Sequence, residues 1–265
     1  MADIKRTGYG NFTIFCFSEL IEPTAFINEF LNAKVLGEKG RGGIRIVTFD
    51  GKAIACRQYI HGGLLRGLTG NLFFTGKRAI REMEMLMYLK DNGFPVVQPY
   101  CVLIEKRILS KIPYLLTILQ ENTIDLMELF KRGSAKDRLR VARKLAELFW
   151  RLENLGVYHP DLHPGNVLVD RERNLFFLDF DKSYRKQMKK KDMAKMFWRL
   201  DRFAEKMEIK GNTAFDAKEK ILFLRTYKRL SGYDIITVMK KQMGAKRLWR
   251  KMGWFIESLL YGGRK

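Results

Sequence analysis

Cysteine is scarce in this chain, which has three, at Cys16, Cys56 and Cys101. Their number is odd, they are widely spaced, and each is set among apolar residues. This pattern is typical of reduced thiols and argues against a disulfide framework or a zinc site. We therefore assign the cysteines no chemistry and expect the protein to work in the cytoplasm.

Long apolar runs are also missing. The longest, such as residues 112–119, fall far below the roughly 18 residues that a membrane-spanning helix needs. The first residues offer no apolar core before a small-residue cleavage site, so we expect no secretory signal. With 265 residues, 46% of them hydrophobic, the chain can still bury a substantial core, and its length is typical of two lobes that share a cleft.

Acidic residues are too few to balance the basic ones. The chain has 29 Asp and Glu against 50 Lys and Arg, a net charge of +21. Most of the excess lies in residues 182–265, where 24 Lys and Arg stand against 8 Asp and Glu among many aromatic residues. A basic, aromatic segment suits an anionic membrane surface, although a solvated helical surface also explains the charge.

The most informative stretch reads Tyr-His-Pro-Asp-Leu-His-Pro-Gly-Asn, and an Asp-Phe pair follows 13 residues after its Asn. A kinase needs a carboxylate that orients the acceptor hydroxyl and accepts its proton, and we assign this role to Asp161. Mg²⁺ takes oxygen ligands and keeps several waters, so Asn166 and Asp179 can hold it. We expect a structural role for His159 and a solvent-facing position for His163. The order of these parts predicts phosphoryl transfer from ATP.

Two apolar segments separate the predicted metal ligands. Residues 167–169 and 175–178 are strand-like, and a polar turn joins them. We expect this hairpin to bring Asn166 and Asp179 together.

A glycine-rich segment near the N-terminus is the candidate phosphate loop. Gly40, Gly42 and Gly43 precede two strand-like segments, residues 44–49 and 53–59. Glycines let a loop fold over phosphates with its backbone amides free to donate. Many hairpins are glycine-rich, so the glycines alone are weak evidence for a phosphate loop. Their position before a strand that carries a cation strengthens this evidence.

That cation is Arg57, which stands where protein kinases have the Lys that pairs with the α- and β-phosphates and with a helix Glu. Lys52, in the preceding turn, is the weaker alternative. Residues 76–92 show helical periodicity and carry Glu82 and Glu84. We expect Glu82 to pair with Arg57, the alternative being a solvent-facing Glu.

The remaining pattern completes a two-lobed layout. Residues 120–123 are the expected hinge, and Ser134 can cap a long amphipathic helix that ends at Gly156. We expect an α+β, bilobal protein-kinase-like fold. Its small β-rich N-lobe spans residues 1–121, and its larger helical C-lobe spans residues 122–265.

Several stretches together resemble the bacterial lipopolysaccharide kinases, which include 3-deoxy-D-manno-octulosonic acid (Kdo) kinase and the core heptose kinase. The resemblance covers about residues 35 to 205, and its motifs are Gly40-Arg41-Gly42, Arg57-Gln58-Tyr59-Ile60-His61-Gly62-Gly63, Phe74-Thr75-Gly76, Arg78-Ala79-Ile80-Arg81-Glu82, Gly93-Phe94-Pro95-Val96-Val97-Gln98-Pro99, the stretch from Tyr158 to Asn166, and Leu178-Asp179-Phe180-Asp181-Lys182.

The resemblance implies ATP as donor, Mg²⁺ as cofactor, a sugar hydroxyl of the lipid A-linked inner core as acceptor, and peripheral attachment to the cytoplasmic face of the bacterial inner membrane. The family's roles carry over to Arg57, Glu82, Asp161, Asn166 and Asp179. Kdo of Kdo-lipid A is the expected acceptor.

Four other functions remain to be weighed. The length of the chain after residue 210 resembles the heptose kinases and leaves the acceptor sugar open. A small-molecule kinase of the aminoglycoside or choline type usually has an acidic cleft, contrary to this charge. A protein kinase fits less well because no Ala-Pro-Glu follows Asp179. A basic binding module explains the charge but not the phosphoryl-transfer residues, so we do not expect nucleic acid as a partner.

Overall fold

The computed structural model describes residues 4–17, 22–36, 43–60, 73–209 and 216–242. The chain divides into two compact units. Met1–Ile124 and Asn166–Ser183 form the first, and Asp125–Gly165 and Tyr184–Lys265 form the second. The segment with Asn166 and Asp179 thus belongs to the same unit as Arg57 and Glu82. The expected division between residues 121 and 122 stays a prediction.

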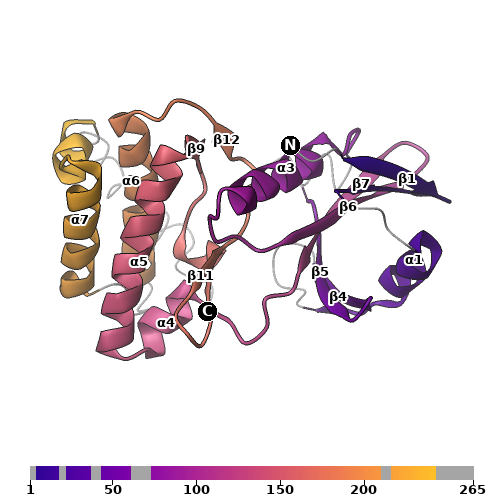
Figure 1. The fold of residues 1–265 in the computed structure, drawn as a ribbon, viewed down its shortest axis with the longest axis horizontal. Coiled ribbons are helices and arrows are strands. Elements are labelled where there is room, and N and C mark those ends of the chain that lie inside the picture. Colours follow the sequence, from indigo (N-terminus) through magenta and orange to yellow (C-terminus); the bar gives the residue numbers. More distant parts are fainter. Residues whose placement is uncertain (1–3, 18–21, 37–42, 61–72, 210–215, 243–265) are drawn as a thin grey trace, which may run out of the picture. The chain divides into compact units, whose positions relative to one another are not determined.

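A seven-stranded antiparallel sheet dominates the first unit (Figure 1). Its order is β1-β2-β6-β7-β5-β4-β3. The strands are β1 (Lys5–Tyr9), β2 (Phe12–Cys16), β3 (Val35–Leu36), β4 (Ile44–Phe49), β5 (Lys52–Gln58), β6 (Pro99–Lys106) and β7 (Lys111–Ile118). This is the β-rich N-terminal part that the sequence predicts.

Two helices cover the sheet, α1 (Pro23–Asn32) and α3 (Lys77–Asp91). Side chains alternate between the two faces of a strand. Leu103 of β6 therefore joins the buried cluster beneath α1, whereas Ile104 lies against Gly76 at the start of α3. α3 agrees with the helix expected over residues 76–92. The sheet thus carries Arg57 while α3 carries Glu82.

A short hairpin completes the first unit. β10 (Val167–Val169) pairs antiparallel with β11 (Leu175–Phe177), and the Leu178 amide donates to the Asn166 carbonyl at 2.9 Å. The expected hairpin between Asn166 and Asp179 is therefore present.

The second unit is mainly helical. Its elements are α4 (Leu126–Arg132), α5 (Ala135–Asn154), β9 (Val157–Tyr158), β12 (Tyr184–Arg185), α6 (Lys190–Ile209) and α7 (Ala217–Ser231). β8 (Ile124–Asp125) lies where the chain enters this unit, and η1 (Pro164–Asn166) lies where it leaves, with Asn166 in the first unit. Ser134 caps α5 by accepting a hydrogen bond from the Asp137 amide, as expected. The three long helices share an aromatic core in which Phe149 contacts Phe197 and Phe223, with ring centroids 5.1 and 5.4 Å apart.

The α+β class is therefore confirmed, with an antiparallel sheet first and helices later (Figure 1). All three cysteines are free and buried. Within the parts of the chain that the structure describes, every helix is too short or too polar to span a bilayer.

Candidate active site

Arg57 lies near the end of β5, in the interior of the sheet. Its partners in the ladder are Ile44 of β4 and Leu115 of β7. Because strands flank it on both sides, the backbone of Arg57 is fixed and only its side chain can move. The Arg57 side chain is 33% exposed, and its guanidinium contacts two carboxylates.

The first carboxylate is Glu82, on α3. Arg57 Nη2 donates to its two oxygens at 2.7 and 2.6 Å, and the Glu82 side chain is 1% exposed. The expected pairing of Arg57 with Glu82 is therefore present. Glu84 is half-buried and forms no ion pair with the described residues. Helical geometry explains why only Glu82 reaches Arg57, since positions 82 and 84 lie about 200° apart around the helix axis.

The second carboxylate is Asp179, 122 residues away in sequence. Arg57 Nη1 donates to Asp179 Oδ1 at 3.2 Å. Asp179 has a φ of 59°, in the left-handed region that Asp tolerates better than most residues. This backbone turn follows directly on the β10–β11 hairpin, so the hairpin and Arg57 together fix the position of the carboxylate.

Tyr59 is a member of this cluster that sequence reasoning missed. Its hydroxyl donates to Glu82, and the Arg57 Cζ lies 4.9 Å from the centre of its ring. The side chain is 2% exposed. The signal was available, because Tyr59 follows Arg57 by two residues and so lies on the same side of an extended chain.

Burial and charge act against each other in this cluster. Burial by itself lowers the pKa of Arg57, but the carboxylates of Glu82 and Asp179 and the phenol of Tyr59 raise it, and the net direction is upward. Burial raises the pKa of Glu82, and Arg57 and the Tyr59 hydroxyl only partly offset this. Burial also raises the pKa of Tyr59 well above its usual value, so its hydroxyl stays protonated and can donate. Arg57 therefore keeps a fixed positive charge.

A second ion pair lies beside the first. Arg78, near the start of α3, binds Asp181 through two nitrogens, and the Asp181 side chain is 7% exposed. Sequence reasoning assigned neither residue a role. Arg78 precedes Glu82 by four residues and so lies on the same face of the helix, which is the signal that could have found it. α3 thus positions two side chains toward the segment that follows the hairpin.

Asn166 and Asp179 are the predicted Mg²⁺ ligands. Asn166 is 8% exposed, and the hairpin places its backbone next to the residue before Asp179. The described residues contain no group of three or more His, Cys, Asp or Glu that could hold a metal ion. One amide oxygen and one carboxylate nevertheless fit Mg²⁺, because this ion keeps several waters and takes few protein ligands.

The candidate phosphate loop is only partly described. Gly40 and Gly42 lie outside the described residues, whereas Gly43 directly precedes β4. Their predicted role at the phosphates stays a prediction.

Asp161 lies in the second unit, in the loop between β9 and η1. Its side chain is 38% exposed, and its backbone amide donates to His159 Nδ1 at 3.3 Å. His159 is 1% exposed, so the buried imidazole anchors the loop, in line with the structural role expected of it.

α6 contacts this loop at two points. Arg199 Nη1 lies 3.4 Å from Asp161 Oδ1, and one turn later Phe203 stacks on His163 at 4.8 Å with an interplanar angle of 6°. His163 also accepts a hydrogen bond from the Gly165 amide at 3.1 Å. His163 is therefore half-buried against the Phe203 ring. The sequence had predicted a solvent-facing position for it, which is only partly correct. Sequence reasoning found no role for Arg199.

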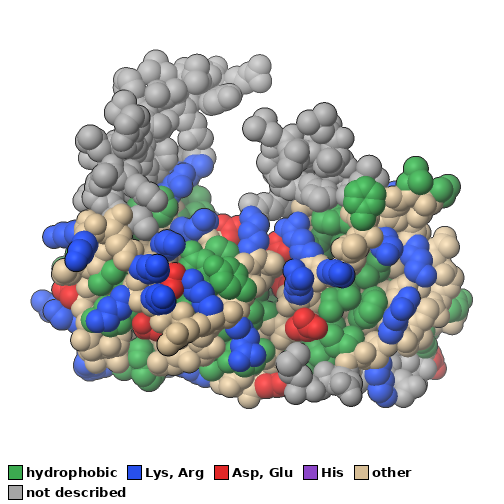
Figure 2. All heavy atoms as spheres, turned by 90° about the horizontal axis from the view of Figure 1, so that it is seen from above, with side chains coloured by type: hydrophobic (Ala, Val, Ile, Leu, Met, Phe, Trp, Pro, Cys, Tyr) green, Lys and Arg blue, Asp and Glu red, His purple; other side chains and the backbone are tan. Residues whose placement is uncertain are grey.

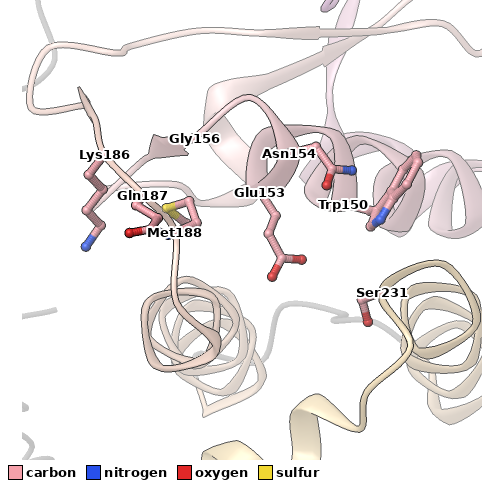
Figure 3. A pocket seen from close by; sticks show the side chains of 8 residues that line it. All are labelled: Trp150, Glu153, Asn154, Gly156, Lys186, Gln187, Met188 and Ser231. Carbon is pink, nitrogen blue, oxygen red and sulfur yellow. The ribbon is translucent and has the colours of Figure 1, made fainter.

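The second unit also has an open pocket of about 400 Å³ between the end of α5 and the segment before α6 (Figure 3). Glu153 extends into the region between the helices, and its carboxylate accepts hydrogen bonds from Tyr227 and Tyr233 at 2.6 and 2.7 Å. None of the predicted site residues lines this pocket.

Comparison with known proteins gives one family and consistent relatives. Three similar curated proteins are named 3-deoxy-D-manno-octulosonic acid kinase. The one from Vibrio cholerae is 32% identical over 158 residues, which cover 58% of this chain and 66% of that protein. The one from Vibrio parahaemolyticus is 29% identical, covering 68% of this chain and 79% of that protein. The one from Photobacterium profundum is 30% identical, covering 69% and 79%.

The family model described as "Lipopolysaccharide kinase (Kdo/WaaP) family" matches residues 29–227, from α1 to the interior of α7. The match includes the strand with Arg57, the helix with Glu82, the loop with Asp161 and the hairpin before Asp179, and it leaves out β1 and β2. This chain therefore belongs to the lipopolysaccharide kinase (Kdo/WaaP) family.

Proposed function

We propose that this protein is a Kdo kinase, which transfers the γ-phosphate of ATP to a hydroxyl of Kdo in Kdo-lipid A. The observation that carries the proposal is the buried Glu82 that holds Arg57, whose guanidinium also contacts Asp179. A cation fixed between a helix Glu and the Asp of an Asp-Phe pair is the arrangement that binds nucleotide phosphates in kinases. Family membership and the relatives' shared name support the acceptor.

The two units correspond in this proposal to the two lobes of a protein-kinase-like fold. The sheet and α3 of the first unit match the expected small lobe, and the helices of the second unit match the expected large one. The family itself supports this fold.

The donor side relies on residues of the first unit. Arg57 binds the α- and β-phosphates, and Glu82 keeps its guanidinium in position. Asn166 and Asp179 hold Mg²⁺, which neutralises phosphate charge when it is bound. Arg57 already contacts Asp179 at 3.2 Å, so the cation and the metal ligand are positioned by one another.

The acceptor side relies on Asp161. Its carboxylate accepts the proton of the sugar hydroxyl while the hydroxyl oxygen forms a bond to the γ-phosphorus and the bond to ADP breaks. The buried His159 beneath the loop restricts the backbone of Asp161, which favours a defined position for the base.

The test is transfer of labelled γ-phosphate from Mg-ATP to Kdo-lipid A, side by side with a heptose-extended core. We expect label on Kdo-lipid A, and in Asp161→Asn a rate about 10²- to 10⁴-fold lower with the KM for ATP unchanged. Label only on the heptose-bearing acceptor would assign the protein to the heptose branch. Transfer to neither acceptor would refute the proposal.

We also propose that the protein binds the cytoplasmic face of the inner membrane as a peripheral protein. Five exposed basic residues follow one face of α6: Lys191, Lys195, Arg199, Arg202 and Lys206. Their spacings of four, four, three and four residues place them within an arc of about 80°. We call this set the α6 basic stripe. Figure 2 shows Lys and Arg side chains over the helical part of the chain and over the sheet part as well. Such a surface attracts anionic lipids.

Charge reversal tests this association. Lys195→Glu with Lys206→Glu should weaken binding to anionic liposomes by at least about tenfold, because each basic residue near a membrane surface contributes about 1 kcal/mol. Lys90→Glu with Lys106→Glu, two exposed residues of the first unit, is the matched control. Equal losses in the two double variants would show that only the overall charge matters.

A further inference from the structure

The α6 basic stripe passes the candidate base. Arg199, in its middle, is the residue whose guanidinium lies 3.4 Å from Asp161. Four residues later, Phe203 stacks on His163 in the same loop. Residues four apart lie on neighbouring parts of a helix surface. α6 therefore contacts the loop at Phe203 and presents Arg199, one turn earlier, beside Asp161. The position of Arg199 relative to the base is therefore set by the helix.

The pair of Arg199 and Asp161 is a loose one. It has a single contact at 3.4 Å, and the two side chains are 46% and 38% exposed. A guanidinium has five N–H donors and binds a carboxylate best through two of them at shorter distances. Exposed single-contact pairs contribute little to stability. Arg199 therefore retains donors that a second anion can use, and leaving Asp161 costs it little.

The proposed acceptor supplies such an anion. An octulosonic acid carries a carboxylate on the same sugar as its hydroxyls, whereas a neutral heptose carries none. A hydroxyl that reaches Asp161 would bring this carboxylate into the neighbourhood of the same loop and helix. A planar guanidinium is the side chain best suited to bind a carboxylate through two hydrogen bonds.

We propose that Arg199 binds the carboxylate of the acceptor sugar and so makes this enzyme specific for a sugar acid. The proposal rests on the proposed Kdo kinase function. When the acceptor binds, Arg199 moves its hydrogen bonds from Asp161 to the sugar carboxylate. The base is thereby released to accept the hydroxyl proton, and an acceptor without a carboxylate leaves Arg199 on the base.

The test crosses two changes, one in the enzyme and one in the acceptor. Wild type and Arg199→Gln are each assayed with Kdo-lipid A and with its Kdo methyl ester, in neutral detergent micelles that remove membrane charge. In wild type, we expect esterification to lower kcat/KM by about 10- to 100-fold, the usual range for a lost charged hydrogen bond. In Arg199→Gln, we expect a similar loss of kcat/KM with the natural acceptor. The ratio of kcat/KM for Kdo-lipid A to kcat/KM for its methyl ester should then be close to one.

Arg202→Gln is the matched control. It removes one charge from the same stripe, but Arg202 lies over the Trp198 ring, with its Cζ 5.6 Å from the ring centre. It should keep the wild-type ratio between the two acceptors. Arg199→Lys should give a ratio of kcat/KM for the two acceptors between those of wild type and Arg199→Gln. An unchanged KM for ATP in each variant shows that the enzyme is folded.

The outcomes separate the two proposals. If Arg199→Gln loses activity but keeps the wild-type preference for the carboxylate, Arg199 only positions Asp161 and the inference is overturned. If Arg202→Gln loses the preference equally, the stripe acts through general charge, which also overturns it. If wild type transfers no phosphate to Kdo-lipid A, the proposed function itself fails.

Discussion

Replacing Glu82 with Gln tests whether one buried carboxylate holds the phosphate-binding cation in place. The change preserves side-chain volume and removes a single charge. Glu82 accepts hydrogen bonds from Arg57 at 2.7 and 2.6 Å and another from the Tyr59 hydroxyl. The Gln amide presents one acceptor and one donor group, so the NH₂ group faces a donor on Arg57 or on Tyr59.

The expected loss follows from the burial of these groups. A hydrogen bond to a charged group contributes about 1.5–3 kcal/mol, and leaving a buried polar group unpaired costs about 1–3 kcal/mol. Arg57 is 33% exposed, so water compensates part of the loss on its side. We expect Glu82→Gln to lower the free energy of unfolding by about 2–3 kcal/mol. The unfolding equilibrium then changes by about 30- to 150-fold.

Urea unfolding monitored by circular dichroism measures this loss. The control is Glu84→Gln on the same helix. It should change the free energy of unfolding by no more than about 0.5 kcal/mol, because Glu84 is half-buried and forms no ion pair with the described residues. A double-mutant cycle with Arg57→Gln should give a coupling energy of at least about 1 kcal/mol. A Glu82→Gln protein as stable as the Glu84→Gln control would refute the argument.

Three further predictions concern the metal ligand, a glycine and a buried phenol. Asp179→Asn should raise the Mg²⁺ concentration needed for half-maximal activity by at least about tenfold, since a charged ligand is lost; an unchanged Mg²⁺ titration would remove Asp179 from the metal site. Gly156→Ala should lower the free energy of unfolding by about 2–3 kcal/mol, because φ is 68° and a Cβ would lie 2.7 Å from the Lys186 carbonyl oxygen. Gly232→Ala, at a φ of 75° with open space around it, should cost only about 1 kcal/mol in the same urea assay. Burial raises the pKa of Tyr114 from 10.0 to about 12, so the unfolded chain loses this proton first and stability falls as the pH rises from 10 to 12. Urea midpoints over this range should fall less steeply in Tyr114→Phe, and parallel curves would contradict the assignment.

Local sequence patterns carried much of the fold. The helix expected over residues 76–92 is α3, the Ser134 cap is present, and the hairpin before Asp179 forms where alternating apolar residues predict it. The prediction that Glu82, and not Glu84, pairs with Arg57 was also confirmed. Each of these features depends on periodicity or on hydrogen bonds between residues a few positions apart, and a sequence shows both directly.

The family was recognisable from the residues of its motifs, and phosphoryl transfer was predicted from the order of the groups along the chain. The order of Asp161, Asn166 and Asp179 identified the chemistry, and the comparisons confirm the family. The catalytic and metal-binding roles of these residues stay predictions until the variants above are assayed.

Only the tertiary structure decided which distant side chains meet. The contact of Arg57 with Asp179 joins residues 122 positions apart, and that of Arg78 with Asp181 joins residues 103 positions apart. The contact of Arg199 with Asp161 likewise depends on how α6 packs beside the loop. Sequence patterns determine which face of a strand or helix a side chain occupies, because those periods are local. They do not determine which other element that face meets, because this depends on sheet order and helix packing across the whole chain.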